Sequence, residues 1–141
     1  MSKTAGYSGT PLIKKLGIKP GQQIAFINSP ANYHNLLGTL PTDLLISNKL
    51  SAKLDFIHYF QKQRSQLEGD FPQLKAALNF DGMLWISWPK RASKVETDIS
   101  DSIVREIGLG NGLVDVKVAA VDSIWSGLKF VYRLEDRPVA K

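Results

Sequence analysis

Residues 24–32 read IAFINSPAN, in which four successive apolar residues lead directly into a polar turn that contains a proline. A strand that is apolar at every position is buried on both faces, which is typical of a parallel sheet covered by helices. The turn after it favours the start of a helix at residue 30, because proline fits the first helical turn. The stretch therefore predicts a strand-turn-helix unit, the building block of an α/β fold.

The same alternation of apolar runs and helical periodicity continues on both sides of this unit. Apolar runs predict strands at residues 23–28, 44–46, 54–60, 83–88, 114–121 and 128–133. Helices are predicted from Thr10 (as N-cap) to Gly17, at residues 30–37, at 62–79 and from 97 to 109. The third of these is expected to be interrupted at residues 69–72, where Gly69-Asp70-Phe71-Pro72 favours a restart.

Continuous apolar strands separated by helices predict a three-layer, Rossmann-like α/β fold with a mostly parallel six-stranded sheet. We expect the strand order 2-1-3-4-6-5, with a C-terminal antiparallel hairpin. Residues 48–53 are a short link for a parallel crossover, so the second strand must itself be very short. Asp81-Gly82 is expected to form a turn just before the fourth strand.

Residues 108–112 read GLGNG, which matches the glycine spacing of a nucleotide-binding turn. Such a turn must leave a strand and enter a helix, so that the helix N-terminus faces the ligand. Here the glycines follow a helical pattern and precede a strand pattern. The sequence therefore predicts a helix terminator, at the end of the sheet opposite any ligand.

Composition limits the class of protein. The 141 residues include no cysteine and carry a net charge of +5, which excludes disulfides and cysteine metal sites and favours acidic partners. We expect a single domain at residues 10–134, a flexible arm at 1–9 and a polar tail at 135–141. No apolar run or signal-peptide pattern indicates a membrane, so a cytoplasmic protein is expected.

Two resemblances follow from these residues. The order of strands and helices, with an Asp55-bearing strand followed by a Gly82 turn, resembles a shortened class I methyltransferase (Rossmann-like) domain. A second resemblance covers nearly the whole chain and is to small bacterial proteins known only as a domain of unknown function. It is carried by residues 6–12, 15–19, 85–90, 97–98, 112–118, 121–122 and 125–131.

The methyltransferase resemblance implies S-adenosylmethionine as cofactor, yet two contacts of that fold are missing. The turn after the first strand holds Asn28-Ser29-Pro30-Ala31-Asn32 in place of glycines, and Ser47-Asn48 stands where an acidic residue would bind the ribose. The sequence therefore favours non-catalytic binding of a small anionic or nucleotide-like ligand. A divergent S-adenosylmethionine-dependent methyltransferase and a basic module for nucleic acid or protein are the alternatives. A homodimer is a separate hypothesis, with Trp125 as its candidate contact.

Ligands of open α/β sheets bind outside the carboxyl ends of the strands. Three loops are expected there, at residues 28–34, 60–64 and 89–94. The first offers Asn28, Ser29 and Asn32 as ligand-binding residues, and the third offers Lys90, Arg91, Ser93 and Lys94. The cations suit a phosphate or carboxylate, although a solvated basic loop paired with Glu96 or Asp98 explains them equally well.

The remaining chemistry-bearing side chains have structural interpretations. His34 could act as a general base, whereas His58, within a strand, is predicted to be packed and hydrogen-bonded. Trp85 and Trp88 have opposite parity on one strand and should face opposite sides of the sheet, whereas Trp125 is expected near the surface in the hairpin connection. No spacing of ligands indicates a metal site.

Overall fold

The computed structural model describes residues 11–50 and 53–138, which form one sheet with helices on both faces. The helices are α1 (Leu12–Leu16), α2 (Tyr33–Leu37), α3 (Arg64–Ala77) and α4 (Asp101–Gly110), with short 3-10 turns η1 (Arg91–Ser93) and η2 (Leu134–Asp136). The strands are β1 (Gln23–Ile27), β2 (Leu45–Ser47), β3 (Leu54–Phe60), β4 (Leu78–Pro89), β5 (Leu113–Ala120) and β6 (Trp125–Tyr132).

The sheet has the order β2-β1-β3-β4-β6-β5, as the sequence predicts. The first four strands of this order are parallel neighbours, whereas β6 runs antiparallel to both β4 and β5. The second strand is only three residues long, which makes the short link to β3 feasible. The six-stranded Rossmann-like fold with a C-terminal hairpin is therefore confirmed.

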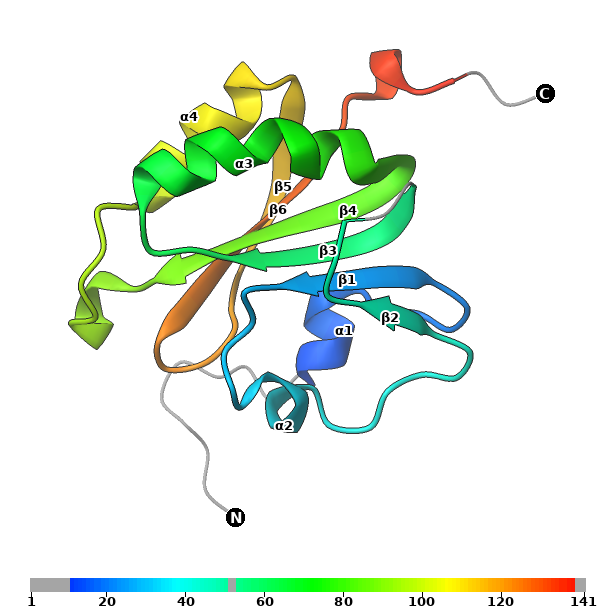
Figure 1. The fold of residues 1–141 in the computed structure, drawn as a ribbon, viewed down its shortest axis with the longest axis horizontal. Coiled ribbons are helices and arrows are strands. Elements are labelled where there is room, and N and C mark those ends of the chain that lie inside the picture. The colour runs from blue at the N-terminus through cyan, green and yellow to red at the C-terminus, as the bar shows by residue number, and fades with distance from the viewer. Residues whose placement is uncertain (1–10, 51–52, 139–141) are drawn as a thin grey trace.

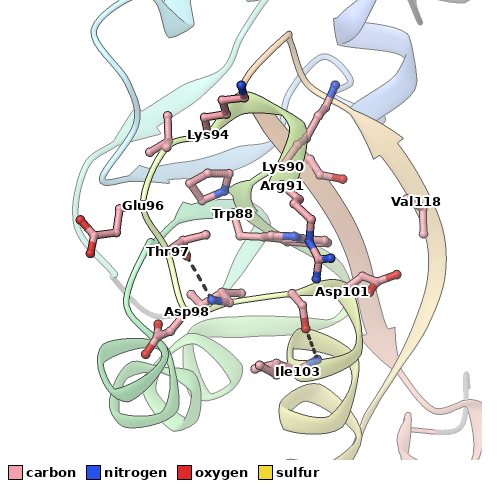
Figure 2. Close-up of a pocket in the computed structure, with 15 residues that line it drawn as sticks. Trp88, Lys90, Arg91, Lys94, Glu96, Thr97, Asp98, Asp101, Ile103 and Val118 are labelled. Carbon is pink, nitrogen blue, oxygen red and sulfur yellow. Dashed lines mark hydrogen bonds between the residues drawn. The ribbon is translucent and has the colours of Figure 1, made fainter.

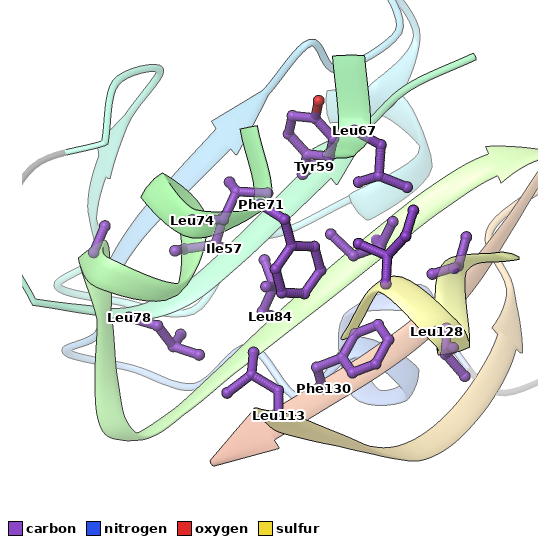
Figure 3. Packing of buried hydrophobic residues seen from close by; sticks show 14 of the residues in the cluster. Ile57, Tyr59, Leu67, Phe71, Leu74, Leu78, Leu84, Leu113, Leu128 and Phe130 are labelled. Atoms are coloured by element: carbon purple, nitrogen blue, oxygen red, sulfur yellow. The ribbon is translucent and has the colours of Figure 1, made fainter. Parts of the chain in front are cut away.

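Helices cover both faces of this sheet (Figure 1), and an apolar core lies beneath the helices on each face. α3 and α4 cover one face, where Phe71 and Phe130 meet edge to face with ring centroids 5.8 Å apart (Figure 3). α1 and α2 cover the other face, where Trp85 is fully buried and donates its indole N–H to the Leu16 carbonyl at 2.9 Å. Trp85 and Trp88 belong to different cores, which confirms their predicted opposite orientation.

The glycines at 108–112 end α4 and lead into β5, as predicted. α4 ends at Gly110, and Gly112 adopts φ +91° immediately before β5 begins at Leu113. The Lys75 ammonium donates to the Asn111 carbonyl at 2.7 Å and so caps this helix end. Leu113 pairs with Tyr132 at the far end of β6, so this turn lies at the sheet edge opposite the carboxyl ends of β1, β3 and β4.

The predicted interruption of the third helix at residues 69–72 is wrong, because α3 is one continuous helix of 14 residues with Pro72 inside it. Pro72 lies on the exposed side, whereas the opposite side buries four residues against the sheet: Leu67, Phe71, Leu74 and Ala77. Each large buried side chain contributes roughly 1.5–3 kcal/mol. Together they outweigh the roughly 3 kcal/mol that a proline costs inside a helix.

The predicted turn at Asp81-Gly82 is also wrong, since both residues belong to β4, which begins at Leu78 and spans 12 residues. The pairing with β3 shifts register between Leu54 and Phe56. A Cβ at Gly82 would lie 2.9 Å from the Leu54 carbonyl oxygen. Glycine here permits a close approach of the two backbones where the pairing is irregular. The Asp81-Gly82 pair has the sequence pattern of a turn, although it lies within a strand.

The boundaries of the domain rest partly on residues outside the described ranges. The predicted N-cap Thr10, the arm at residues 1–9 and part of the 48–53 link lie there. Within the predicted tail, the Arg137 guanidinium donates to the Tyr132 carbonyl at 2.9 Å and ties the η2 turn to the end of β6.

Candidate functional site

The carboxyl edge of the sheet gathers the loops that follow β1, β3 and β4. The chain leaves β1 toward β2 on one side and returns to β3 on the other side of β1. Between β1 and β3 the strand order therefore reverses, and this switch point is where open α/β sheets bind their ligands.

A hollow of about 440 Å³ lies at this switch point, and we call it the switch-point hollow. It is lined by Asn28 and Pro30 after β1, by Phe60, Gln61, Lys62 and Gln63 at and after the end of β3, and by Trp125. Asn28 has φ 59°, a left-handed conformation that glycine would adopt without strain. Its amide nitrogen donates to the Phe60 carbonyl at 3.2 Å, which joins the two loops.

Aromatic side chains form one wall of the switch-point hollow. Trp125 and Phe60 meet edge to face with centroids 5.1 Å apart. The prediction that Trp125 lies near the surface in the hairpin connection is wrong, because it is the first residue of β6 and only 9% exposed. Its contact with Phe60, the last residue of β3, joins two segments far apart in the sequence and could not be predicted from local sequence.

A buried polar network lies directly behind this wall. The Phe60 ring stacks on the His58 imidazole at 4.1 Å between centroids. The two ring nitrogens of His58 bond the hydroxyls of Tyr33 at 2.6 Å and Ser87 at 2.8 Å. Because all three residues are fully buried, the prediction of a packed, hydrogen-bonded His58 is confirmed. Burial lowers the pKa of His58 to about 3 and raises the pKa of Tyr33 well above its usual value, so both stay neutral near pH 7.

A second hollow, of about 350 Å³, lies on the other side of the β1 end, and we call it the β2-side hollow. It is lined by Ile27, by Asn48, Lys49 and Leu50 after β2, and by Tyr59, Asp70, Gln73 and Leu74. The Tyr59 hydroxyl donates to the Asp70 carboxylate at 2.6 Å, which fixes that carboxylate at the hollow. Burial raises the pKa of Tyr59, so the hydroxyl keeps its proton.

The largest of the hollows described here, about 830 Å³, lies beyond the end of β4, and we call it the basic hollow (Figure 2). It is bounded by the loop after β4, by the start of α4 and by Val118 of β5. Lys90, Arg91 and Lys94 line it, whereas Trp88, Ile99 and Ile103 supply apolar surface.

The segment at 97–98 connects the basic hollow to the loop after β3. The Thr97 hydroxyl donates to the Lys62 carbonyl at 2.6 Å, and the Asp98 carboxylate accepts from the Arg64 amide at 2.7 Å, at the first residue of α3. The predicted helix start at Thr97-Asp98 is therefore wrong. α4 begins at Asp101 with Ser100 as its N-cap, and Asp98 instead satisfies the N-terminus of another helix.

The structure divides the predicted ligand-binding residues between hollows. Asn28 lines the switch-point hollow, whereas Lys90, Arg91 and Lys94 line the basic hollow. Ser29, Asn32 and Ser93 line neither of them. The Ser93 hydroxyl donates to the Lys90 carbonyl at 2.6 Å and accepts from the Val95 amide, so it shapes the basic loop.

Sequence reasoning did not propose Gln63, Lys62 or Asp70 as ligand-binding residues. Lys62 and Gln63 belong to the loop that was expected at the carboxyl edge, and the parallel pairing of β1 with β3 places them in the switch-point hollow. The path of α3 adds Asp70 in the β2-side hollow. His34, the candidate general base, is exposed on α2 and lines none of the three hollows.

Among the described residues, no group of three or more histidine and carboxylate side chains could hold a metal ion. The helices in the same part of the chain are all too short or too polar to cross a membrane.

Comparison with known proteins gives a result for the fold and none for the sequence. No family model and no curated protein matches the sequence, so the resemblance to the uncharacterised bacterial family is not confirmed. Three solved structures are similar over most of their length. A SAM-dependent methyltransferase from Aquifex aeolicus has a TM-score of 0.58 at 17% identity, covering 84% of this chain and 86% of that one.

Magnesium protoporphyrin IX methyltransferase from Synechocystis, with bound SAH, has a TM-score of 0.58 at 13% identity, over 86% of this chain and 78% of that one. A ribosomal protein L11 methylase from Lactobacillus delbrueckii has a TM-score of 0.56 at 15% identity, covering 86% of this chain and 75% of that one. Identities this low show the fold alone. The chain therefore has the Rossmann-like fold of SAM-dependent (S-adenosylmethionine-dependent) methyltransferases.

Proposed function

We propose that this protein is a divergent SAM-dependent methyltransferase that binds its cofactor across the carboxyl end of β1. The observation that carries the proposal is the switch-point hollow, which lies where the strand order reverses and where this class of sheet binds ligands. Structures of the same fold that contain SAM or SAH support it. The sequence alone favours non-catalytic ligand binding and gives a divergent methyltransferase as an alternative.

The side chains of the switch-point hollow suit the amino-acid part of such a cofactor. Asn28 and Gln63 supply amide groups, and Lys62 supplies a cation that can face a carboxylate. Gln61 serves the site indirectly, because its side-chain oxygen accepts from the Lys62 and Gln63 amides and so shapes the loop. Pro30 removes one backbone donor from the turn, so we expect weaker binding than a glycine-rich turn would give.

The β2-side hollow suits the ribose. The Ser47 hydroxyl is engaged by the Lys49 amide at 3.0 Å, and no acidic residue follows β2. Asp70, brought in by α3, supplies a carboxylate in that hollow instead, next to Asn48. The two hollows lie on opposite faces of the sheet, because Phe60 belongs to one core and Tyr59 to the other. In this proposal an elongated nucleoside ligand therefore passes over the carboxyl end of β1, where Ile27 borders one hollow and Asn28 the other. When bound, the cofactor supplies an activated methyl group.

Calorimetric titration of the full chain with SAM and SAH tests the proposal. We expect saturable binding of both, weakened about tenfold or more by Lys62→Ala, because a charged hydrogen bond contributes roughly 1.5–3 kcal/mol. We expect a similar loss with Asp70→Asn. Lys14→Ala, which removes an exposed cation from α1, should leave the affinity unchanged.

The absence of binding of both compounds at millimolar concentration would contradict the proposal. Binding of adenosine phosphates in place of SAM and SAH would favour the non-catalytic nucleotide-binding interpretation.

A further inference from the structure

The basic hollow contains cations whose charged ends have no partner among the described residues. No hydrogen bond or ion pair joins the charged ends of Lys90, Arg91 or Lys94 to another residue in the described part of the chain. The carboxylates of the same hollow are Glu96, Asp98 and Asp101. Asp98 is held by the Arg64 amide, and Figure 2 shows Glu96 directed away from the three cations.

The loop that holds these cations is fixed by backbone hydrogen bonds, one to the β5–β6 connection and one within the loop. The Lys90 amide donates to the Ile124 carbonyl at 2.7 Å, and the Lys94 amide donates to the Arg91 carbonyl at 3.1 Å. Lys94 adopts φ 62°, a left-handed conformation that is unfavourable for a non-glycine residue and is held here by the structure of the turn. Three cations are thus presented from a short, ordered turn, which lowers the entropy lost when a ligand orders them.

Apolar surface adjoins the cations. Trp88, Ile99 and Ile103 line the hollow, and Val118 at its border is 57% exposed. The start of α4 borders the same hollow through Ser100, whose hydroxyl accepts from the Ile103 amide, and through Asp101. The hollow therefore combines an anion-binding side with an apolar side.

We propose that the basic hollow is a second binding site that takes a small phosphorylated molecule with an apolar or aromatic portion. Lys90, Arg91 and Lys94 hold the phosphate, and Trp88 and Val118 contact the remainder. As the site of the methyl acceptor, it rests on the proposed function. The Thr97 and Asp98 contacts with Lys62 and Arg64 place the basic hollow beside the loop that lines the switch-point hollow.

Titration of the full chain with phenyl phosphate, followed by calorimetry in the absence of cofactor, tests this proposal. We expect saturable binding that Lys90→Gln combined with Arg91→Gln weakens about tenfold or more, since charge-assisted contacts to phosphate are lost. Lys14→Gln combined with Lys19→Gln removes the same charge from exposed positions away from the basic hollow and should leave binding unchanged. Inorganic phosphate should bind more weakly than phenyl phosphate, because it leaves the apolar side empty.

Each other outcome of this experiment has a definite meaning. Equal losses of affinity for phenyl phosphate in the two double variants would overturn the proposal, because binding would then depend only on the net positive charge of the protein. Tighter binding of a single-stranded oligonucleotide, with steep salt dependence, would overturn it in favour of a nucleic-acid surface. Phenyl phosphate binding without SAH binding would leave this site standing and reject the methyltransferase proposal, and SAH binding without phenyl phosphate binding would do the reverse. An unchanged thermal midpoint shows that the variants are folded.

Discussion

Replacing Gly108 with alanine is expected to destabilise the protein by about 2–3 kcal/mol, despite the better helix propensity of alanine. Gly108 lies in α4 against the Phe130 ring, and a Cβ at this position would overlap that ring. Phe130 is fully buried between Phe71 and the sheet, so it cannot turn away without disturbing the core. Chemical denaturation of the full chain measures the effect as a lower midpoint with an unchanged slope.

The neighbouring Gly110 provides a matched control. It belongs to the same helix and has no heavy atom within 4 Å of an added Cβ, so Gly110→Ala should be neutral or stabilising by up to about 1 kcal/mol. Gly108→Ala should cost less when Phe130 is also changed to leucine, because the two residues share one contact. Equal effects of the two glycine substitutions would contradict the packing described for α4.

Acidification is expected to lower the free energy of unfolding by about 2 kcal/mol between pH 7 and pH 5, through His58 alone. The pKa of His58 is about 3 in the folded protein, against an ordinary value of 6.5. Between these values the unfolded chain binds a proton that the folded chain excludes, so stability falls as pH falls below 6.5 and is fully present above it. Urea denaturation at a series of pH values measures this slope.

The matched variants are His58→Gln and His34→Gln. Glutamine at position 58 has no titratable group, so this variant should be less stable at pH 7 but should lose the slope between pH 5 and 6.5. His34 is exposed, and its replacement should leave the slope intact. A slope that persists in His58→Gln would show that another group carries the pH dependence.

The buried strands could be predicted because burial on both faces leaves a continuous apolar run in the sequence, as in β1 and β3. The helix boundaries were harder, because the deciding contacts are distant in sequence. Pro72 remains helical owing to the packing of the opposite side of α3. The helix expected to start at Thr97-Asp98 begins at Asp101 instead, and the Asp98 carboxylate accepts from the amide of Arg64, 34 positions away.

The candidate site was predicted where its residues are adjacent in sequence. Lys90, Arg91 and Lys94 follow one strand and meet in one hollow. By contrast, the switch-point hollow combines Asn28, Gln63 and Trp125 from three separate segments. No local spacing connects them, and only the pairing of β1 with β3 and of β4 with β6 brings them together.

Mapping of amide chemical shifts during titration of the ¹⁵N-labelled chain with SAH tests the central claim most directly, since a chain of 15.6 kDa gives well-resolved spectra. Saturable shifts are expected at Asn28, Lys62 and Gln63, around the switch-point hollow. Gly112 and Lys75, at the opposite edge of the sheet, should not move. A spectrum unchanged at millimolar SAH, or shifts confined to residues away from the β1 and β3 ends, would contradict the account.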